Sequence, residues 1–429
     1  MIRVFKFGGA CLKDAAAIKN AANIINKTID DSPLVLVVSA MGKMTNAFEQ
    51  LHKNWLEGKN TSADIEHIIT FHQDILQDLF DESDFIQEQF HQIIEKIVQL
   101  LQKSTGTTYS FDQSYDLLVP YGELISSLIV HEFLKKQGFH SHSVHAPSHI
   151  FADDTWREGR INWEKTVSQI KQEILPILSS DDKSVIVSQG FIAASASTQM
   201  ITLGREGSDF TASIYAYALD AESVTIWKDV QGIYNADPKS FEEVTLIPSL
   251  SYHEAVELAY YGQSVIHPKT IKPLQNKKIP LHIRSFVDIN LPGSIISSDS
   301  SHDTDIPCFI LKKNQVLISV SPKDFAFINE QNLGEITACL AEIRVRMNVM
   351  QNSAISFSFC ADYNDFKLTH LTKKLANKYF VKYNNGLELI TIRNYNDKII
   401  SKLTKGKKIL LEQKSRSTAQ LVTAQHNFL

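Results

Sequence analysis

Residues 203–209, with the sequence LGREGSD, place small residues, one guanidinium and carboxylates directly before a helical pattern. A helix is predicted from Asp209 onwards, because apolar residues follow at helical spacing, at Phe210, Ile214, Tyr217 and Ala218. Glycine allows close backbone approach, and the free N–H groups and dipole of a helix N-terminus stabilise negative charge. The segment therefore indicates an anion-binding corner, although a turn that merely caps a helix is the commoner interpretation of so short a motif.

A second group of such residues follows the first predicted strand. Lys6 ends this strand, and Gly8 and Gly9 come next, at the sheet edge where open α/β folds bind ligands. The lysine can neutralise charge between phosphoryl oxygens, and the glycines can wrap a phosphate. The Walker pattern G-x-x-x-x-G-K-[ST] is missing here, which excludes a P-loop nucleoside triphosphatase as the simple interpretation.

Polar residues also follow the second predicted strand and open a later helix. Ser39 and Thr45 put hydroxyl groups at the end of the strand that precedes them. Glu123 lies in the first turn of a very apolar helix. Stabilisation of the helix dipole explains this carboxylate as well as ligand binding does, so both interpretations stay open.

Residues 227–238 combine a strand end with a turn that contains a lysine, an aromatic ring and two aspartates. Such a loop can hold adenine against Tyr234, while Lys228, Asp229 and Asp237 address phosphates and Mg²⁺. Taken alone, the segment would be read as a surface hairpin.

The elements that must position these residues alternate between strand and helix. Apolar runs at 2–7, 34–39, 185–189 and 223–227 predict buried strands, and helical patterns at 15–26, 121–136 and 210–219 lie between them. This order predicts an α/β fold with a mainly parallel sheet that helices cover on both faces. We expect a catalytic domain over residues 1–292, with a helical hairpin inserted at about 62–104 and broken near residues 81–84.

A Ser-, Asp- and Pro-rich stretch predicts a linker at residues 293–307. Beyond it, residues 316–320 and 354–359 look like strands around a helix at 333–344, and residues 387–393, 408–412 and 418–423 suggest a shorter second set. We therefore expect a small βαβ-type module that occurs twice in tandem over residues 308–429. The second copy is expected to be curtailed, that is, shorter than the first.

Length, charge and amino-acid composition indicate which class of protein, compartment and partners to expect. The chain has 429 residues, 43% of them hydrophobic, and a net charge of -5 without a dense Lys/Arg face, so nucleic acid is not an expected partner. No signal sequence and no run of eighteen apolar residues is visible, and we expect a cytoplasmic protein with no membrane partner. The four cysteines are scattered, and the histidines at 131, 140, 142, 145 and 149 share no face with carboxylates, so no disulfide framework and no metal site is indicated.

Four segments together resemble one family: KFGG at 6–9, GREGSD at 204–209, DVQGIYNADP at 229–238 and GQSVIHP at 262–268. With Ser39, Thr45 and the Gly122-Glu123 pair, they look like the amino-acid kinase superfamily, and specifically aspartokinase. The expected helical insertion and a C-terminal region similar to tandem ACT domains extend the resemblance over nearly the whole chain.

The resemblance implies a role for each matching residue. Arg205 matches the arginine that grips the substrate α-carboxylate, and Glu123 the carboxylate that takes the α-ammonium group. The hydroxyls of Ser39, Thr45 and Ser208 match donors around the substrate. Lys6 matches the phosphate clamp, and Asp209 matches the carboxylate that organises the catalytic lysines. ATP contacts are implied for Lys6, Gly8, Gly9, Lys228, Asp229, Tyr234, Asp237 and Ser264.

The implied reaction is Mg²⁺-dependent transfer of the ATP γ-phosphoryl group to the β-carboxylate of L-aspartate, which opens the synthesis of lysine, threonine and methionine. The nucleophile is already ionised, so positioning and charge neutralisation suffice. A kinase for another carboxylate or carbamate is disfavoured, because Glu123 and Arg205 together suit a zwitterionic amino acid.

The chain departs from the family pattern at two places. Ala10 and Cys11 stand where a Thr-Ser pair is usual, and Ser264 stands where the family carries a lysine that contacts the nucleotide phosphates. Lys228 or Lys269 can supply the missing charge. The alternative is a catalytically weak amino-acid-binding or regulatory protein. Cys11 is expected to be a small packing residue rather than a reactive thiol.

The C-terminal resemblance implies an amino-acid effector site and a homodimer or higher homo-oligomer. Lysine-sensitive relatives carry an aspartate near the start of the second ACT strand, where this chain has Asn348. An amide brings no counter-charge for an effector ammonium group. We therefore expect weak or absent inhibition by lysine.

Overall fold

The computed structural model describes residues 1–29, 32–103, 109–263, 266–324 and 326–425, which form two compact units. The first unit comprises Met1–Ile233, Leu246–Val256 and Val265–Ser300. The second unit comprises Tyr234–Thr245, Glu257–Ser264 and Ser301–Leu429.

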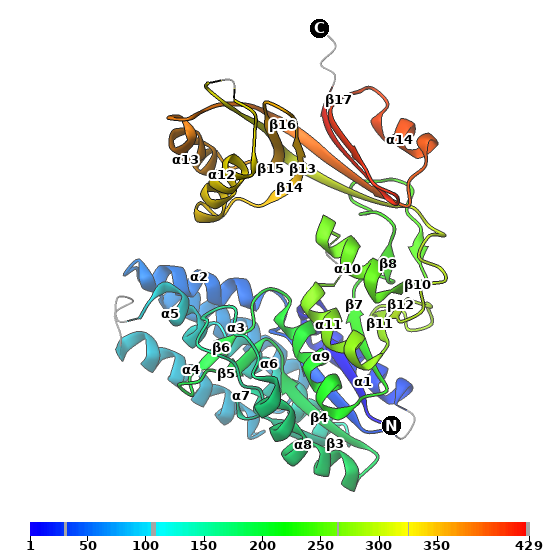
Figure 1. Cartoon of the computed structure of the whole chain (residues 1–429). Coiled ribbons are helices and arrows are strands. Elements are labelled where there is room, and N and C mark those ends of the chain that lie inside the picture. The colour runs from blue at the N-terminus through cyan, green and yellow to red at the C-terminus, as the bar shows by residue number, and fades with distance from the viewer. Residues whose placement is uncertain (30–31, 104–108, 264–265, 325, 426–429) are drawn as a thin grey trace. The chain divides into compact units, whose positions relative to one another are not determined.

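An eight-stranded sheet forms the centre of the first unit, in the order β10-β12-β11-β7-β1-β2-β4-β3 (Figure 1). Its strands are β1 (Arg3–Phe7), β2 (Leu34–Val38), β3 (His140–Val144), β4 (Ser184–Gln189), β7 (Ser223–Lys228), β10 (Ser249–Ser251), β11 (Leu281–Ser285) and β12 (Ser294–Ser297). The pairs are parallel except β11 with β12. The predicted α/β fold with a mainly parallel sheet is confirmed. β12 lies inside the segment 293–307 that the sequence suggests as a linker, so the linker is shorter at its start than expected.

Helices cover both faces of this sheet. Phe5 and Phe7 of β1 belong to a core cluster that also contains residues of α1 (Ala15–Thr28) and α6 (Tyr121–Lys136). α9 (Gly207–Leu219) packs on β1, β2 and β7, and α8 (Trp163–Ser180) packs on β4. Since successive strand residues point to opposite faces, Lys6 points away from Phe5 and Phe7, toward the side of α9.

The expected helical hairpin is formed by α3 (Ser62–Leu79) and α4 (Ile86–Lys103). Ile68, Ile75, Phe90 and Ile97 join the core cluster of α1 and α6, which explains their helical spacing. The stretch Phe111–Lys136 is long and apolar enough to cross a membrane, but 67% of its most apolar window is buried within the protein. It therefore has the character of core helices.

Short elements connect these layers. The helices are η1 (Gly9–Leu12), α2 (Met44–Leu56), α5 (Phe111–Leu118), α7 (Ala146–His149), α10 (Tyr252–Tyr261) and α11 (Pro268–Lys277). Two small ribbons pair β5 (Ile192–Ala194) with β6 (Met200–Thr202), and β8 (Ile233–Tyr234) with β9 (Leu246–Ile247). β6 ends directly before the segment 203–209.

A six-stranded antiparallel sheet forms the second unit, in the order β14-β15-β13-β16-β18-β17 (Figure 1). Its strands are β13 (Cys308–Pro322), β14 (Met347–Asn352), β15 (Phe357–Asp362), β16 (Tyr379–Arg393), β17 (Lys407–Lys414) and β18 (Thr418–Gln425). The helices are α12 (Glu330–Glu342), α13 (Asp365–Leu375) and α14 (Asp397–Thr404). This arrangement is consistent with ACT-like domains.

The structure corrects the predicted start of one strand in this unit. Residues 354–359 are expected to be a strand, but β15 begins at Phe357, because Ser353 and Ser356 close a turn through hydrogen bonds between them.

Candidate functional site

Two lysines from adjacent parallel strands meet one buried carboxylate. Lys6 lies on β1 and Lys228 ends β7, which pairs with β1. Lys6 Nζ lies 2.5 Å from Asp209 Oδ1, and Lys228 Nζ lies 3.5 Å from Asp209 Oδ2. Asp209 is in the first turn of α9 and is 2% exposed. The structure therefore brings together three residues that are far apart in the sequence.

Charge balance keeps Asp209 ionised in this position. Burial raises the pKa of the Asp209 carboxyl, but the ammonium groups of Lys6 and Lys228 outweigh burial and hold the pKa below its ordinary value. One carboxylate thus orients two ammonium groups, so the cluster carries a net positive charge toward a ligand.

The glycines after β1 let two loops touch. A Cβ atom on Gly9 would lie 2.6 Å from the carbonyl oxygen of Ala40 and 2.7 Å from that of Gly42, distances that no side chain tolerates. Gly42 N donates to Gly9 O at 2.9 Å. The loops that follow β1 and β2 are therefore in backbone contact, and Gly8 is beside the ammonium group of Lys6.

Glu123 offers a buried carboxylate oxygen without a hydrogen-bond partner in the described part of the chain. Its side chain is 2% exposed, Oε1 accepts from Ala40 N at 3.3 Å, and Oε2 is the unpartnered atom. Burial raises the pKa of Glu123 to about 8, against weaker lowering by the Ala40 hydrogen bond and by Lys6. An unpartnered buried oxygen is costly unless a ligand satisfies it, so dipole stabilisation alone does not account for Glu123.

The other predicted hydroxyl residues lie near the same strand ends. Ser39 follows β2, and its carbonyl accepts from Ser126 Oγ on α6 at 2.7 Å. Thr45 is half-buried in the first turn of α2. Ser208 is 7% exposed in the first turn of α9, next to Asp209.

The loop before α9 has a strained backbone. Arg205 is exposed between Gly204, with a φ of +73°, and Glu206, with a φ of +56°. A left-handed φ at a glutamate is uncommon, and Glu206 Oε2 is buried without a hydrogen-bond partner among the described residues. Burial raises the pKa of Glu206. Sequence reasoning gave Glu206 no role, although it lies inside the GREGSD segment.

Besides Lys6, Gly8 and Gly9, the residues predicted to contact the nucleotide are Lys228, Asp229, Tyr234, Asp237 and Ser264. Lys228 and the exposed Asp229 belong to the first unit, and Tyr234 and the exposed Asp237 to the second. Gln263 donates to the carbonyl of Tyr234. Ser264 lies outside the described residues.

The two candidates for the missing lysine differ in what they contact. Lys228 contacts Asp209, as described, whereas Lys269 Nζ donates to the carbonyl of Leu203 at 2.7 Å. Burial lowers the pKa of Lys269. Lys269 therefore holds the start of the 203–209 loop, and Lys228 is the one in the charged cluster.

Cys11 and His267 both have structural contacts. Cys11 is buried, its Sγ donates to the carbonyl of Trp227, and burial raises the pKa of its thiol to about 12, which favours the neutral thiol. His267 caps α11 by accepting from Lys269 N. Within the described ranges, no three His, Cys, Asp or Glu side chains gather as a metal site.

A polar cluster joins β13, β14 and β15 of the second unit. Asn348 Oδ1 accepts from Lys312 Nζ at 2.8 Å, and Asn348 Nδ2 donates to Gln315 Oε1 at 2.9 Å and to Asp362 Oδ1 at 3.1 Å. Gln315 Nε2 also donates to Asp362 Oδ1, at 2.8 Å. The chain thus supplies an ammonium group of its own to Asn348.

Residues 1–285 match the amino acid kinase family, and the chain belongs to this family. It is similar to the bifunctional aspartokinase/homoserine dehydrogenase 2, chloroplastic, of Arabidopsis thaliana, with 26% identity over 88% of this chain and 42% of that protein. The chain therefore spans less than half the length of that curated relative.

Two solved structures of E. coli aspartokinase III share the fold. The complex with aspartate and ADP (R-state) has a TM-score of 0.82 at 24% identity and covers 99% of this chain and 96% of that one. The complex with lysine and aspartate (T-state) has a TM-score of 0.81 at 25% identity and covers 98% and 95%. The resemblance to aspartokinases is confirmed.

Proposed function

We propose that this protein is an aspartate kinase, which transfers the γ-phosphoryl group of ATP to the β-carboxylate of L-aspartate and releases ADP and 4-phospho-L-aspartate. The observation that carries the proposal is the Lys6–Asp209–Lys228 cluster, together with the buried, unpartnered oxygen of Glu123. Similarity to proteins named aspartokinase supports it.

The amino acid is recognised at its two charged ends. Glu123 Oε2 receives the α-ammonium group, which satisfies an oxygen that has no hydrogen-bond partner among the described residues. The exposed guanidinium of Arg205 binds the α-carboxylate as a fork. The hydroxyls of Ser39, Thr45 and Ser208 then bind polar atoms between these ends.

Phosphoryl transfer needs little beyond charge and alignment. A β-carboxylate oxygen of aspartate forms a bond to the γ-phosphorus as the bond from that phosphorus to the β,γ-bridging oxygen breaks, and ADP takes the electron pair. Lys6 and Lys228 neutralise charge on the transferred group, and Asp209 fixes their direction. Lys228 thereby takes the role of the lysine that is absent at Ser264. The nucleophile is ionised at neutral pH, so no general base is required.

The nucleotide brings Mg²⁺ with it. Mg²⁺ prefers oxygen ligands and is commonly bound by phosphates with one or two carboxylates. The exposed carboxylate of Asp229 at the end of β7 has the fitting chemistry, with Asp237 as the other aspartate of the motif. Gly8 and Gly9 bind the phosphates through backbone N–H groups, and Tyr234 remains the expected adenine contact from the motif alone.

An ADP-release assay with L-aspartate, L-glutamate or no amino acid tests the proposal. We expect release with aspartate only, and trapping of the acyl phosphate as a hydroxamate by added hydroxylamine. Aspartate binding without ADP release would favour the alternative of an amino-acid-binding protein. Release that is equal without any amino acid would contradict kinase activity on aspartate.

A further inference from the structure

Helix α5 (Phe111–Leu118) has no role in the chemistry above, yet its polar side chains reach the elements that hold the amino acid. It directly precedes α6, whose first turn carries Glu123. Asp116 on α5 is fully buried. A buried carboxylate is unfavourable unless it accepts hydrogen bonds, so its partners indicate what it is for.

One carboxylate oxygen of Asp116 accepts a hydrogen bond from the residue before the 203–209 loop, and the other accepts from a neighbouring loop that contains Arg157. Thr202 Oγ1 donates to Oδ1 at 2.6 Å, and Arg157 N donates to Oδ2 at 2.7 Å. Burial raises the pKa of Asp116 to about 6, so the carboxylate is still ionised at neutral pH and both hydrogen bonds are charge-assisted.

The two donors support the loop from different sides. Thr202 ends β6 and is followed at once by Leu203, Gly204 and Arg205. A Cβ atom on Gly204 would lie 3.0 Å from the carbonyl oxygen of Arg157, so the Arg157 backbone lies directly against the loop. Arg157 has a φ of +65°, a strained conformation that needs such fixation.

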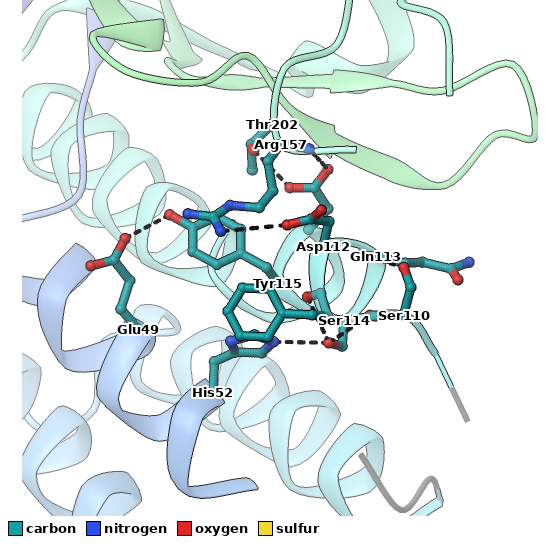
Figure 2. Close-up of polar contacts among 11 residues, drawn as sticks. Glu49, His52, Ser110, Asp112, Gln113, Ser114, Tyr115, Arg157 and Thr202 are labelled. Atoms are coloured by element: carbon teal, nitrogen blue, oxygen red, sulfur yellow. Dashed lines mark hydrogen bonds and ion pairs between the residues drawn. The ribbon is translucent and has the colours of Figure 1, made fainter. Parts of the chain in front are cut away.

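The preceding residue on α5, Tyr115, contacts a second part of the site. Tyr115 OH donates to Glu49 Oε1 at 2.8 Å, and Glu49 lies on α2 one turn after Thr45. The guanidinium of Arg157 is 4.2 Å from the centre of the Tyr115 ring. Figure 2 shows Glu49, Tyr115, Arg157 and Thr202 in this continuous arrangement.

We propose that Asp116 is a positioning residue for the amino-acid site: through Thr202 and Arg157 it holds the loop that presents Arg205 to the substrate carboxylate. This inference rests on the proposed function, because it takes Arg205 as a substrate contact. It assigns to α5 the task of keeping the α-carboxylate contact at a fixed distance from Glu123 on the following helix.

Two variants and one control test it. Asp116→Asn removes the negative charge and replaces one accepting oxygen with an NH₂ group, and Thr202→Val removes the hydroxyl donor at nearly constant volume. Each should raise the KM for aspartate on the order of tenfold and leave the KM for ATP almost unchanged, since a lost hydrogen bond to a charged group is the cause. Ser114→Ala is the matched control. Ser114 is also fully buried on α5, but it bonds His52 rather than the loop, so the melting temperature should fall without a change in KM.

Hydrogen exchange gives a readout that does not depend on kinase activity. Amides of residues 202–209 should exchange on the order of ten times faster in Asp116→Asn and Thr202→Val than in the parent, and at parental rates in Ser114→Ala. If the parent lacks kinase activity but the loop loosens as expected, the proposed function fails and the positioning role stands. Unchanged loop exchange in both variants, or equal increases in the KM for aspartate and for ATP, would overturn the positioning role.

Discussion

The Glu123 carboxyl group should couple aspartate binding to proton release. Burial raises the pKa of Glu123 to about 8, so in the free protein about one molecule in ten carries the ionised form at pH 7. Only the carboxylate can pair with the α-ammonium group of the substrate. Binding at pH 7 should therefore release about 0.9 proton from this group, and the KM for aspartate should fall about tenfold from pH 6 to pH 7 and level off above pH 8.

The substitution Glu123→Gln isolates this effect. Glutamine matches the shape of the protonated side chain but has no charge at any pH, so the variant should bind aspartate poorly throughout and lose the pH dependence. The gap between parent and variant should be largest above pH 8, where a lost buried charge pair is worth about 2–5 kcal/mol, and should shrink about tenfold for each pH unit below 8. Ser127→Ala, at another buried polar residue of α6, is the control that keeps the parental profile.

As pH rises, the free energy of unfolding should fall, whereas the affinity for aspartate should rise. The pKa is higher in the folded than in the unfolded protein, so the folded state keeps the proton longer, and its stability falls as pH rises from about 4.5 to 8. Ionisation at pH 8 costs the parent a few kcal/mol, up to about 5 from the pKa difference. Glu123→Gln lacks this penalty and should unfold at a higher temperature than the parent at pH 8, but not near pH 4.5.

Calorimetric titration with aspartate in two buffers of different ionisation enthalpy measures the proton release, and initial rates from pH 6 to pH 8.5 measure the KM profile. A parental KM that is flat across this range, or a profile that Glu123→Gln shares, would refute the reasoning. So would identical binding heats in the two buffers.

Three further outcomes are expected. Arg205→Ala should raise the KM for aspartate at least about tenfold, whereas Arg160→Ala should not; unchanged kinetics of the first variant would remove Arg205 from the site. Lys228→Thr should lower kcat roughly 10²–10³-fold, and adding Ser264→Lys should restore part of it; a fully active Lys228→Thr enzyme would show that Lys228 does not replace the missing lysine. Lysine and threonine at low micromolar concentration should leave the rate of a dimer unchanged, because the chain's own ammonium group already occupies Asn348; strong inhibition, or a monomer in light scattering, would contradict this.

Local patterns were enough to predict much of the first unit. The strand that ends at Lys6 and the helix over Tyr121–Lys136 follow from continuous apolar runs and helical periodicity, and both are present. The antiparallel sheet of the second unit was harder to predict. β14 has the sequence MNVMQN and lies at a sheet edge, where pairing with β15 rather than side-chain pattern decides its conformation.

The site could be predicted as a set of residues but not as a set of contacts. The sequence motifs identify Lys6, Lys228 and Asp209 as separate candidate residues. Their contact in space depends on which strands are neighbours in the sheet, and the motifs do not give that order. The residues next to Asp116 in the sequence do not indicate its role, because both of its hydrogen-bond partners lie more than forty residues away. Glu206 could be identified as part of the GREGSD motif, but its left-handed backbone conformation could not be predicted from the sequence.

The contact between Gly9 and the carbonyls of Ala40 and Gly42 bears on how this family can drift in sequence. The turn is specified by main-chain atoms of Gly9, Ala40 and Gly42, so it does not depend on a hydroxyl side chain at Ala10 or Cys11. A single added methyl group at Gly9, which looks conservative on paper, would force the two loops of the site apart.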